Sequence, residues 1–276
     1  MSTYKDLLQS ARKVLKDNRI ADADTDAWYL LSYVFGIDRT GYLLSENKTA
    51  AEEDGLRYLQ LVEKRAEHIP LQYITGSQEF MGLEFEVTPA VLIPRQDTEI
   101  LAEEALKLCD GKSVLDMCTG SGCIIISVAK LGRPLKAAGV DISMAALELA
   151  AGNAARHGVE IEFINSNLFD RVEGYYDIIV SNPPYIPTKV IDVLMPEVKE
   201  HEPLIALDGS EDGLHFYRSI TAALERHLCR KGTILFEIGC DQGEAVSSIL
   251  AERGFEEIRI KKDLSGLDRV VSARRP

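Results

Sequence analysis

Residues 177–185 of the chain have the sequence Asp-Ile-Ile-Val-Ser-Asn-Pro-Pro-Tyr. The apolar run at 178–180 is too short for a helix, is β-branched and hardly alternates, which is typical of a strand buried on both faces of a parallel sheet. The two prolines fix φ and cannot donate to a sheet ladder, so the chain must leave the sheet in a rigid, extended conformation. Asn182 and Tyr185 are therefore expected just beyond the carboxyl end of a central strand, where open α/β sheets bind ligands. On this stretch alone, a stiff strand exit without any chemistry is an equal alternative.

Upstream of this strand, a second strand and its turn have the features of a nucleoside site. We expect a strand at 114–117, a turn at 119–122 with the sequence Thr-Gly-Ser-Gly, and a helix at 124–131. Glycines permit positive φ and close approach of a ligand to the backbone, and a helix N-terminus offers free N–H groups. Asp141 ends the next strand, where a carboxylate can accept hydrogen bonds from two ribose hydroxyls. The pattern indicates a nucleoside-bearing cofactor without specifying which one; a tight turn with an N-capping aspartate is the simpler alternative.

After residue 111, strands and helices alternate regularly, which predicts a parallel sheet wrapped by helices. A helix is expected at 242–253, and further strands are expected at 161–166, 176–181 and 233–238. The last two strands, at 257–261 and 269–273, are too close together for a helical crossover, so they should be antiparallel. Such a sheet differs from an NAD-binding fold.

The first seventy residues are predicted to form a separate helical bundle. Apolar residues recur at helical spacing in three segments, which are 7–15, 28–35 and 56–66. Asp24 or Thr25 is expected to cap the second helix, Gly36 to close it, and Thr49 to cap the third. We assign Trp28 to the core of this bundle rather than to a ligand site.

Residues 71–95 are predicted to be a linker that contains a β-hairpin, because 80–87 alternate apolar and polar residues around a glycine. Asp97 or Thr98 is then expected to cap a helix that runs through Cys109. Arg95 has two interpretations, a surface ion-pair partner or a lid over the cofactor, and the sequence alone favours the first.

Composition limits the classes of function. The chain has 276 residues, of which 46% are hydrophobic, enough to bury a sizeable core in one or two domains. A net charge of −13 argues against binding nucleic acid through broad phosphate neutralisation.

The five cysteines are scattered without a C-x-x-C pair or neighbouring histidines, which indicates reduced thiols and no metal site. Residues 1–20 do not resemble a signal peptide, and no apolar stretch is long enough to cross a bilayer. We therefore expect a cytoplasmic protein that binds neither a membrane nor nucleic acid directly. We also expect a monomer, although composition does not bear on the oligomeric state.

Several segments together resemble one enzyme family. The stretches 116–122, 140–141 and 182–185 are similar to an S-adenosylmethionine signature and an amide or amine target motif. With 92–99 and 202–207 added, the chain resembles the release-factor glutamine N5-methyltransferases over almost its whole length. The Asn-Pro-Pro-Tyr motif alone also occurs in DNA adenine methyltransferases; its combination with the other segments is much narrower.

The resemblance implies an α/β fold of the class I S-adenosylmethionine-dependent methyltransferases. The sheet would be Rossmann-like, seven-stranded and mostly parallel, with an antiparallel last strand. Residues 1–70 would form a helical substrate-docking domain, 71–95 the hairpin linker and 96–276 the catalytic domain.

The implied activity is methylation of the side-chain amide N5 of the glutamine in the Gly-Gly-Gln motif of class 1 peptide chain release factors, which modulates translation termination. S-adenosyl-L-methionine would be the cofactor and S-adenosyl-L-homocysteine its product. The alternatives are methylation of a glutamine in a ribosomal protein, methylation of adenine N6 in nucleic acid, and a binding module that has lost activity.

The resemblance also implies the site residues. The cofactor would contact Cys118, Thr119, Gly120, Ser121, Gly122, Asp141, Leu168 and Asn182. The substrate glutamine would be held by Asn182, Pro183, Pro184 and Tyr185, of which Asn182, Pro183 and Tyr185 would be catalytic. Cys118 stands where the family usually has glycine, Asn167 where it commonly has aspartate, and Leu168 where it often has an aromatic residue.

The expected chemistry follows from the target atom. An amide nitrogen is a poor nucleophile, so positioning beside an electrophilic methyl does most of the work. The Asn182 side-chain oxygen and the Pro183 carbonyl can each accept one amide N–H and so favour the positive charge that develops on nitrogen. Tyr185 can stack on the planar amide.

Overall fold

The computed structural model describes residues 2–276. The described chain forms two compact units. The first comprises Met1–Gly76 together with Met195–His201, and the second comprises Ser77–Leu194 together with Glu202–Pro276. No helix among the described residues combines the length and apolar character that a membrane span requires.

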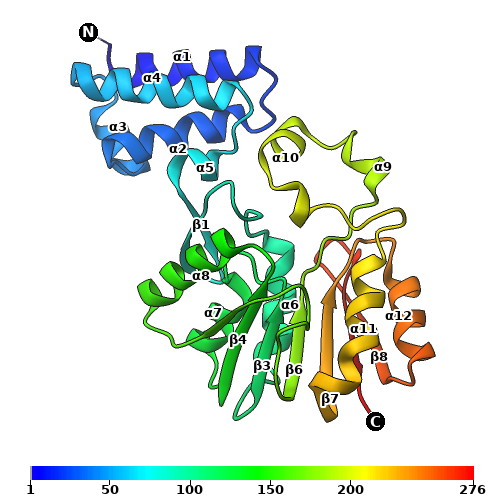
Figure 1. Ribbon diagram of the computed structural model, residues 1–276. Coiled ribbons are helices and arrows are strands. Elements are labelled where there is room, and N and C mark those ends of the chain that lie inside the picture. The colour runs from blue at the N-terminus through cyan, green and yellow to red at the C-terminus, as the bar shows by residue number, and fades with distance from the viewer. Residues whose placement is uncertain (1) are drawn as a thin grey trace. The chain divides into compact units, whose positions relative to one another are not determined.

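The first unit is a helical bundle. Its helices are α1 (Tyr4–Asp17), α2 (Ala23–Phe35), α3 (Arg39–Ser45), α4 (Glu52–Ala66), α5 (Leu71–Thr75) and α10 (Pro196–His201). Helices α1, α2 and α4 pack against one another (Figure 1). Trp28 is buried among the core residues of this bundle, as predicted. The Tyr58 hydroxyl donates to the Ala27 carbonyl over 2.9 Å, so this large buried ring has its polar end satisfied.

The ends of these helices differ in part from the prediction. Gly36 closes α2 in the left-handed conformation (φ 62°), as predicted. Helix α2 begins at Ala23 with Asp22 as its N-cap, so Asp24 and Thr25 lie inside the helix. Helix α4 begins at Glu52 with Ala51 as its N-cap, so Thr49 does not cap it. Helix α3 was not predicted, because none of its residues is buried and it therefore has no apolar stripe.

A buried arginine ties α10 into the first unit. Arg65 Nε lies 2.7 Å from Asp26 Oδ2, and Arg65 Nη2 lies 2.6 Å from Glu197 Oε2. A third contact runs from Nη1 to the Ile69 carbonyl. A buried guanidinium requires such partners, because an unpaired charge is costly away from water. Residues 195–201 therefore belong to the first unit, although the sequence assigned them to the catalytic domain.

The second unit begins with a β-hairpin of β1 (Ser77–Phe80) and β2 (Leu83–Glu86), which pair antiparallel as expected. Among the described residues it also contains a seven-stranded sheet with the order β5-β4-β3-β6-β7-β9-β8. These strands are β3 (Ser113–Met117), β4 (Lys136–Asp141), β5 (Glu162–Asn165), β6 (Tyr176–Ser181), β7 (Leu228–Glu237), β8 (Glu256–Lys262) and β9 (Asp268–Arg274). Strands β5, β4, β3, β6 and β7 pair in parallel, and β9 is antiparallel to β7 and β8. The predicted fold class is therefore confirmed.

Helices cover both faces of this sheet (Figure 1). One face packs against α6 (Gln96–Leu106), α7 (Cys123–Leu131) and α8 (Met144–His157), and the other against α11 (His215–His227) and α12 (Gly243–Glu252). Ile178 and Val180 point to the first face and Ile179 to the second. This explains why the apolar run shows no alternation: β6 is buried on both sides. Short helical turns at α9 (Thr188–Ile191) and Leu204–Ala206 follow the strand.

Replacing Arg65 with alanine should destabilise the first unit. The change leaves the buried Asp26 carboxylate without its partner, and breaking a buried pair in this way typically costs about 3–5 kcal/mol. We expect the free energy of unfolding in urea to fall by about that amount. Lys64→Ala, at the exposed neighbouring position, is the control and should change it by less than about 0.5 kcal/mol. Equal stability of the two variants would contradict the assignment of Arg65 as the anchor of α10.

Candidate active site

A cavity opens at the carboxyl ends of β3, β4 and β6. Its wall includes Cys118, Thr119, Gly120, Ser121, Asp141, Leu168, Asn182 and Pro184, all of them predicted site residues. They converge because parallel strands end at one edge of the sheet. Met117 is paired with Val140 and with Ser181, so the three strand ends are in register. Gly122, Pro183 and Tyr185 are not in the cavity wall.

Asp141 is held in place by main-chain donors. Gly120 N donates to its Oδ2 over 2.9 Å, and Ser143 N donates to its Oδ1 over 2.9 Å. Burial raises the pKa of Asp141, and these hydrogen bonds oppose that shift. A carboxylate oxygen can accept two hydrogen bonds, so each oxygen retains acceptor capacity toward the cavity. With apolar neighbours such as Leu168 and Ile142 in the same wall, the site fits a nucleoside that carries two vicinal hydroxyls.

The two glycines of the turn have different roles. Gly120 has φ 55°, and a Cβ built there would meet nothing within 4 Å, so this residue keeps the cavity open. At Gly122, with φ 79°, a Cβ would lie 2.8 Å from Ile126 Cδ1. Gly122 therefore permits close packing of α7 against α8.

Cys118 and Leu168 also adopt left-handed backbone conformations, with φ 65° and 47°. Such conformations are unfavourable for residues with a side chain and persist where the surrounding structure imposes them. At Cys118, this explains the preference for glycine that the family resemblance implies. Burial raises the pKa of the Cys118 thiol, so the thiol stays neutral in the cavity wall.

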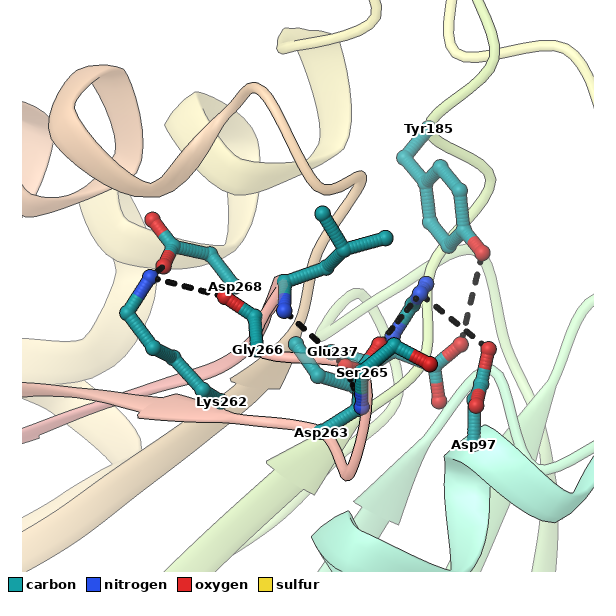
Figure 2. A network of polar contacts seen from close by, with 10 residues as sticks. Asp97, Tyr185, Glu237, Lys262, Asp263, Ser265, Gly266 and Asp268 are labelled. Carbon is teal, nitrogen blue, oxygen red and sulfur yellow. Dashed lines mark hydrogen bonds and ion pairs between the residues drawn. The ribbon is translucent and has the colours of Figure 1, made fainter.

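The side chains of Asn182 and Tyr185, which follow β6, point in different directions. Asn182 lines the cavity, and its Nδ2 donates to Thr98 Oγ1 over 3.3 Å. The Tyr185 hydroxyl instead donates to Glu237 Oε1 over 3.3 Å, as Figure 2 shows. The Tyr185 carbonyl accepts from Gln242 Nε2 over 2.9 Å, which fixes the loop beyond the prolines. This geometry does not bring the Tyr185 ring to the cavity, where stacking on a substrate amide would require it.

Arg95 is an ion-pair partner, the interpretation that the sequence favoured, and it also contributes to the cavity wall. Its guanidinium forms an ion pair with the buried carboxylate of Glu202, and Arg95 itself lines the cavity. Pro94 and Pro203 lie in the same wall. The two segments around Arg95 and Glu202 are thus joined at the cavity, although more than a hundred residues separate them.

Sequence reasoning placed neither Thr98 nor Glu237 in the site. Thr98 was taken for a helix cap, but α6 begins at Gln96 with Arg95 as its N-cap, so the Thr98 side chain is available to Asn182. Glu237 ends β7 and is almost fully buried. Burial raises its pKa to about 7, against the opposing effects of Thr98, Arg269 and Tyr185. A carboxylate at the end of an apolar strand was the sequence signal for Glu237.

Two families match the chain: the PrmC N-terminal domain over residues 6–76 and the methyltransferase small domain over residues 96–197. A release factor glutamine methyltransferase of Geobacter sulfurreducens is 42% identical over 99% of this chain and 96% of the relative. The chain belongs to the release factor glutamine methyltransferase family. Another member, from Agrobacterium fabrum, is 40% identical over 97% of this chain and 96% of the relative.

A solved structure is similar in fold to most of this chain. A 16S rRNA N2 G1207 methyltransferase of T. thermophilus, in complex with AdoMet and guanosine, matches with a TM-score of 0.54. The match covers 72% of this chain and 50% of that chain at 17% identity, which establishes similarity of fold.

Proposed function

We propose that this protein transfers a methyl group from S-adenosylmethionine to the side-chain amide nitrogen of the glutamine in the Gly-Gly-Gln motif of a class 1 release factor. The observation that carries the proposal is the position of Asn182 in the wall of a cavity suited to a nucleoside. Family membership supports the substrate, because the relatives are named for release factor glutamine methylation.

The cofactor assignment is supported by the chemistry of the cavity wall. S-adenosylmethionine supplies an electrophilic methyl group on a sulfonium. Asp141 would accept hydrogen bonds from the ribose hydroxyls, Leu168 would contact the adenine, and residues 118–121 would lie along the methionine part. The structural neighbour from T. thermophilus contains AdoMet in its own site.

The side chain of Asn182 would orient the substrate amide. Its Nδ2 is engaged by Thr98, which leaves Oδ1 as the acceptor for an amide N–H of the substrate. An acceptor there favours the positive charge that develops on nitrogen as the methyl group is transferred. The carbonyl of Pro183 would be a second acceptor on a stiff backbone. The described residues that line the cavity include no histidine, and none is needed if the amide proton leaves after transfer.

The first unit would dock the release factor. It exposes large apolar side chains, among them Leu43 and Leu44 of α3, and exposed apolar residues of this size are candidates for a protein interface. The implied docking domain at residues 1–70 would therefore use a surface outside the catalytic unit.

A panel of substrates tests the activity. Candidate proteins and DNA would be incubated with methyl-labelled S-adenosylmethionine and examined by mass spectrometry. We expect one methyl group on the glutamine of Gly-Gly-Gln in a class 1 release factor. If only a glutamine of a ribosomal protein were labelled, the reaction would stand but the proposed substrate would be wrong. Label on adenine would overturn the proposal.

Replacing Asn182 with alanine should lower kcat by about 10² or more, the scale for loss of one preorganised acceptor. The dissociation constant for the cofactor should change little. The matched control is Asn167→Ala, which removes another asparagine of the same cavity wall; at saturating cofactor it should retain kcat within a few-fold. Near-normal turnover of Asn182→Ala would remove the residue from catalysis.

Replacing Asp141 with alanine should weaken cofactor binding by about 10-fold or more, because hydrogen bonds to a charged group contribute about 1.5–3 kcal/mol. Titration calorimetry measures the dissociation constant, and the melting temperature checks that the strand end remains folded. The control is Asp170→Ala, at an exposed position near the same site. Unchanged affinity would show that Asp141 does not hold the ribose.

The double variant Leu43→Ser, Leu44→Ser should raise KM for full-length release factor by about 10-fold, the scale for loss of an apolar anchor in an interface. The KM for S-adenosylmethionine should not change. Leu264→Ser, at a still more exposed leucine in the second unit, is the control and should leave both constants unchanged. An unchanged KM for release factor in the double variant would remove α3 from the docking surface.

A further inference from the structure

A groove lined with basic residues lies in the second unit, at the amino ends of β6 and β7. It shares no residue with the cavity at Asn182, which lies beyond the carboxyl end of β6. The groove has a volume of about 790 Å³, within the range of small-ligand sites. Its wall contains three acidic residues and seven basic ones, which are Lys107, Lys112, Arg230, Lys231, Arg259, Lys261 and Arg274. This local excess of positive charge contrasts with the net charge of −13 of the whole chain.

The floor of the groove is a face of the sheet that carries hydroxyl groups. Leu235 of β7 and Val270 of β9 are buried in the core that this face shares with α6. Side chains of a strand alternate between its two faces, so Thr233 and Ser272 lie on the same face as these two residues, and both belong to the groove wall. Ser272 is paired with Arg259 across β9 and β8. Hydroxyl donors and a guanidinium therefore occur side by side on the floor.

The backbone of β7 is distorted where it supplies two of the cations. Strand β6 advances by two residues where β7 advances by five, so Arg230 and Lys231 lie in a bulge. Lys231 has φ 61°, a conformation that is unfavourable for lysine and persists where the surrounding structure imposes it. A Cβ at Gly232 would lie 2.8 Å from the Cys229 carbonyl oxygen and 2.9 Å from that of Asp177, so the bulge is tightly folded. Such bulges re-aim side chains.

A second bulge occurs in β8. This strand advances by three residues from Glu256 to Arg259, where β9 advances by two, and Glu257 has φ 52°. Strand β8 is at the edge of the sheet, where basic residues commonly prevent pairing with other chains. That role would account for Arg259 but not for the cations of β7, which is an interior strand. The two strands thus supply cations to one groove for a reason other than edge protection.

The acidic residues of the wall are already engaged. Glu104 Oε1 lies 2.6 Å from Lys107 Nζ, and Glu257 Oε1 lies 3.0 Å from Arg274 Nη1. Asp177 Oδ2 accepts two hydrogen bonds from the first residue of β3, one from the main chain and one from the hydroxyl. Each carboxylate therefore has partners within the unit.

Three of the cations, in contrast, have no counter-charge. Arg230, Lys231 and Arg259 are exposed and form no ion pair with another described residue. Their donors remain available to a ligand with negative oxygens, and arginine and lysine together are typical partners of phosphate.

We propose that this groove binds a small oligophosphate, a ligand that carries several linked phosphate groups. Arg230, Lys231 and Arg259 come from separate strands, so linked phosphates would reach more of them than one isolated anion does. Nucleic acid fits less well, because the described residues of the wall include no aromatic ring on which a base could stack. The negative charge of the rest of the chain also repels a long polyanion beyond the groove.

The test measures binding of inorganic tripolyphosphate to the full-length protein by titration calorimetry. S-adenosylhomocysteine is present throughout, so that the cofactor cavity is occupied. The comparison ligands, at equal ionic strength, are inorganic phosphate, citrate and a single-stranded RNA oligomer. We expect tripolyphosphate to bind about 10-fold or more tightly than phosphate or citrate, the effect of one further charge-assisted hydrogen bond.

Charge reversal locates the site. The double variant Arg230→Glu, Lys231→Glu should weaken tripolyphosphate binding by about 100-fold, which corresponds to the loss of two charge-assisted contacts. The control is Arg226→Glu, Arg253→Glu, which changes the net charge equally at exposed positions outside the groove. Screening by salt should keep its effect within about threefold. Melting temperatures check that both variants fold, and Arg230→Gln, Lys231→Gln, with an expected loss of about 10-fold, replaces the reversal if it does not fold.

Equal loss of binding in the two double variants would overturn the proposal, because it would show a general effect of charge. Equal affinity for citrate and tripolyphosphate would also overturn it. RNA that binds more tightly than tripolyphosphate, and is released by the reversal at Arg230 and Lys231, would assign the groove to nucleic acid instead. None of these results depends on methyl transfer, so they leave the proposed function untouched.

Discussion

The strand β6 has to end at Ser181, and the arrangement of the site depends on that constraint. Pro183 and Pro184 cannot donate to a ladder, so the chain must leave the centre of the sheet at this level. The Ser181 hydroxyl donates to the Met117 carbonyl over 2.7 Å, which fastens the end of β6 to the end of β3. Asn182 is therefore placed at the sheet edge by backbone geometry before any ligand is present.

Side-chain hydrogen bonds hold the segment that follows β6. Glu237, at the end of β7, is buried, and its Oε1 accepts a hydrogen bond from the Tyr185 hydroxyl over 3.3 Å. Asn182 Nδ2 donates to Thr98 on α6, so separate side-chain hydrogen bonds hold the two ends of the Asn-Pro-Pro-Tyr segment.

The sequence predicted those features that depend on local chemistry. Local pattern predicted the chain breaks at glycines and prolines, the burial of residues 178–180 on both faces of the sheet, and the antiparallel last strand. The structure has all three features. Asp141 and the turn at 118–121 reach the cavity for the same reason, since parallel strands end at one edge.

Features that depend on contacts between distant segments were not predictable. Glu197 joins the first unit through Arg65, a partner 132 positions away. Tyr185 points to Glu237 because a buried carboxylate needs its hydroxyl, which no local pattern reveals. Thr98 was expected to cap a helix, but α6 begins two residues earlier, at Gln96. The Thr98 side chain instead contacts Asn182. Helix α3 has no buried residue, so hydrophobic spacing gives no sign of it.

The central claim is that the Asn182 side-chain oxygen faces the substrate. Neutron diffraction from deuterated crystals, grown with S-adenosylhomocysteine and a peptide containing Gly-Gly-Gln, would locate the deuterons of the side-chain amide directly. We expect them on the nitrogen that faces Thr98, with Oδ1 about 2.9 Å from the substrate amide nitrogen. Deuterons directed at the substrate, with Oδ1 toward Thr98, would contradict the account.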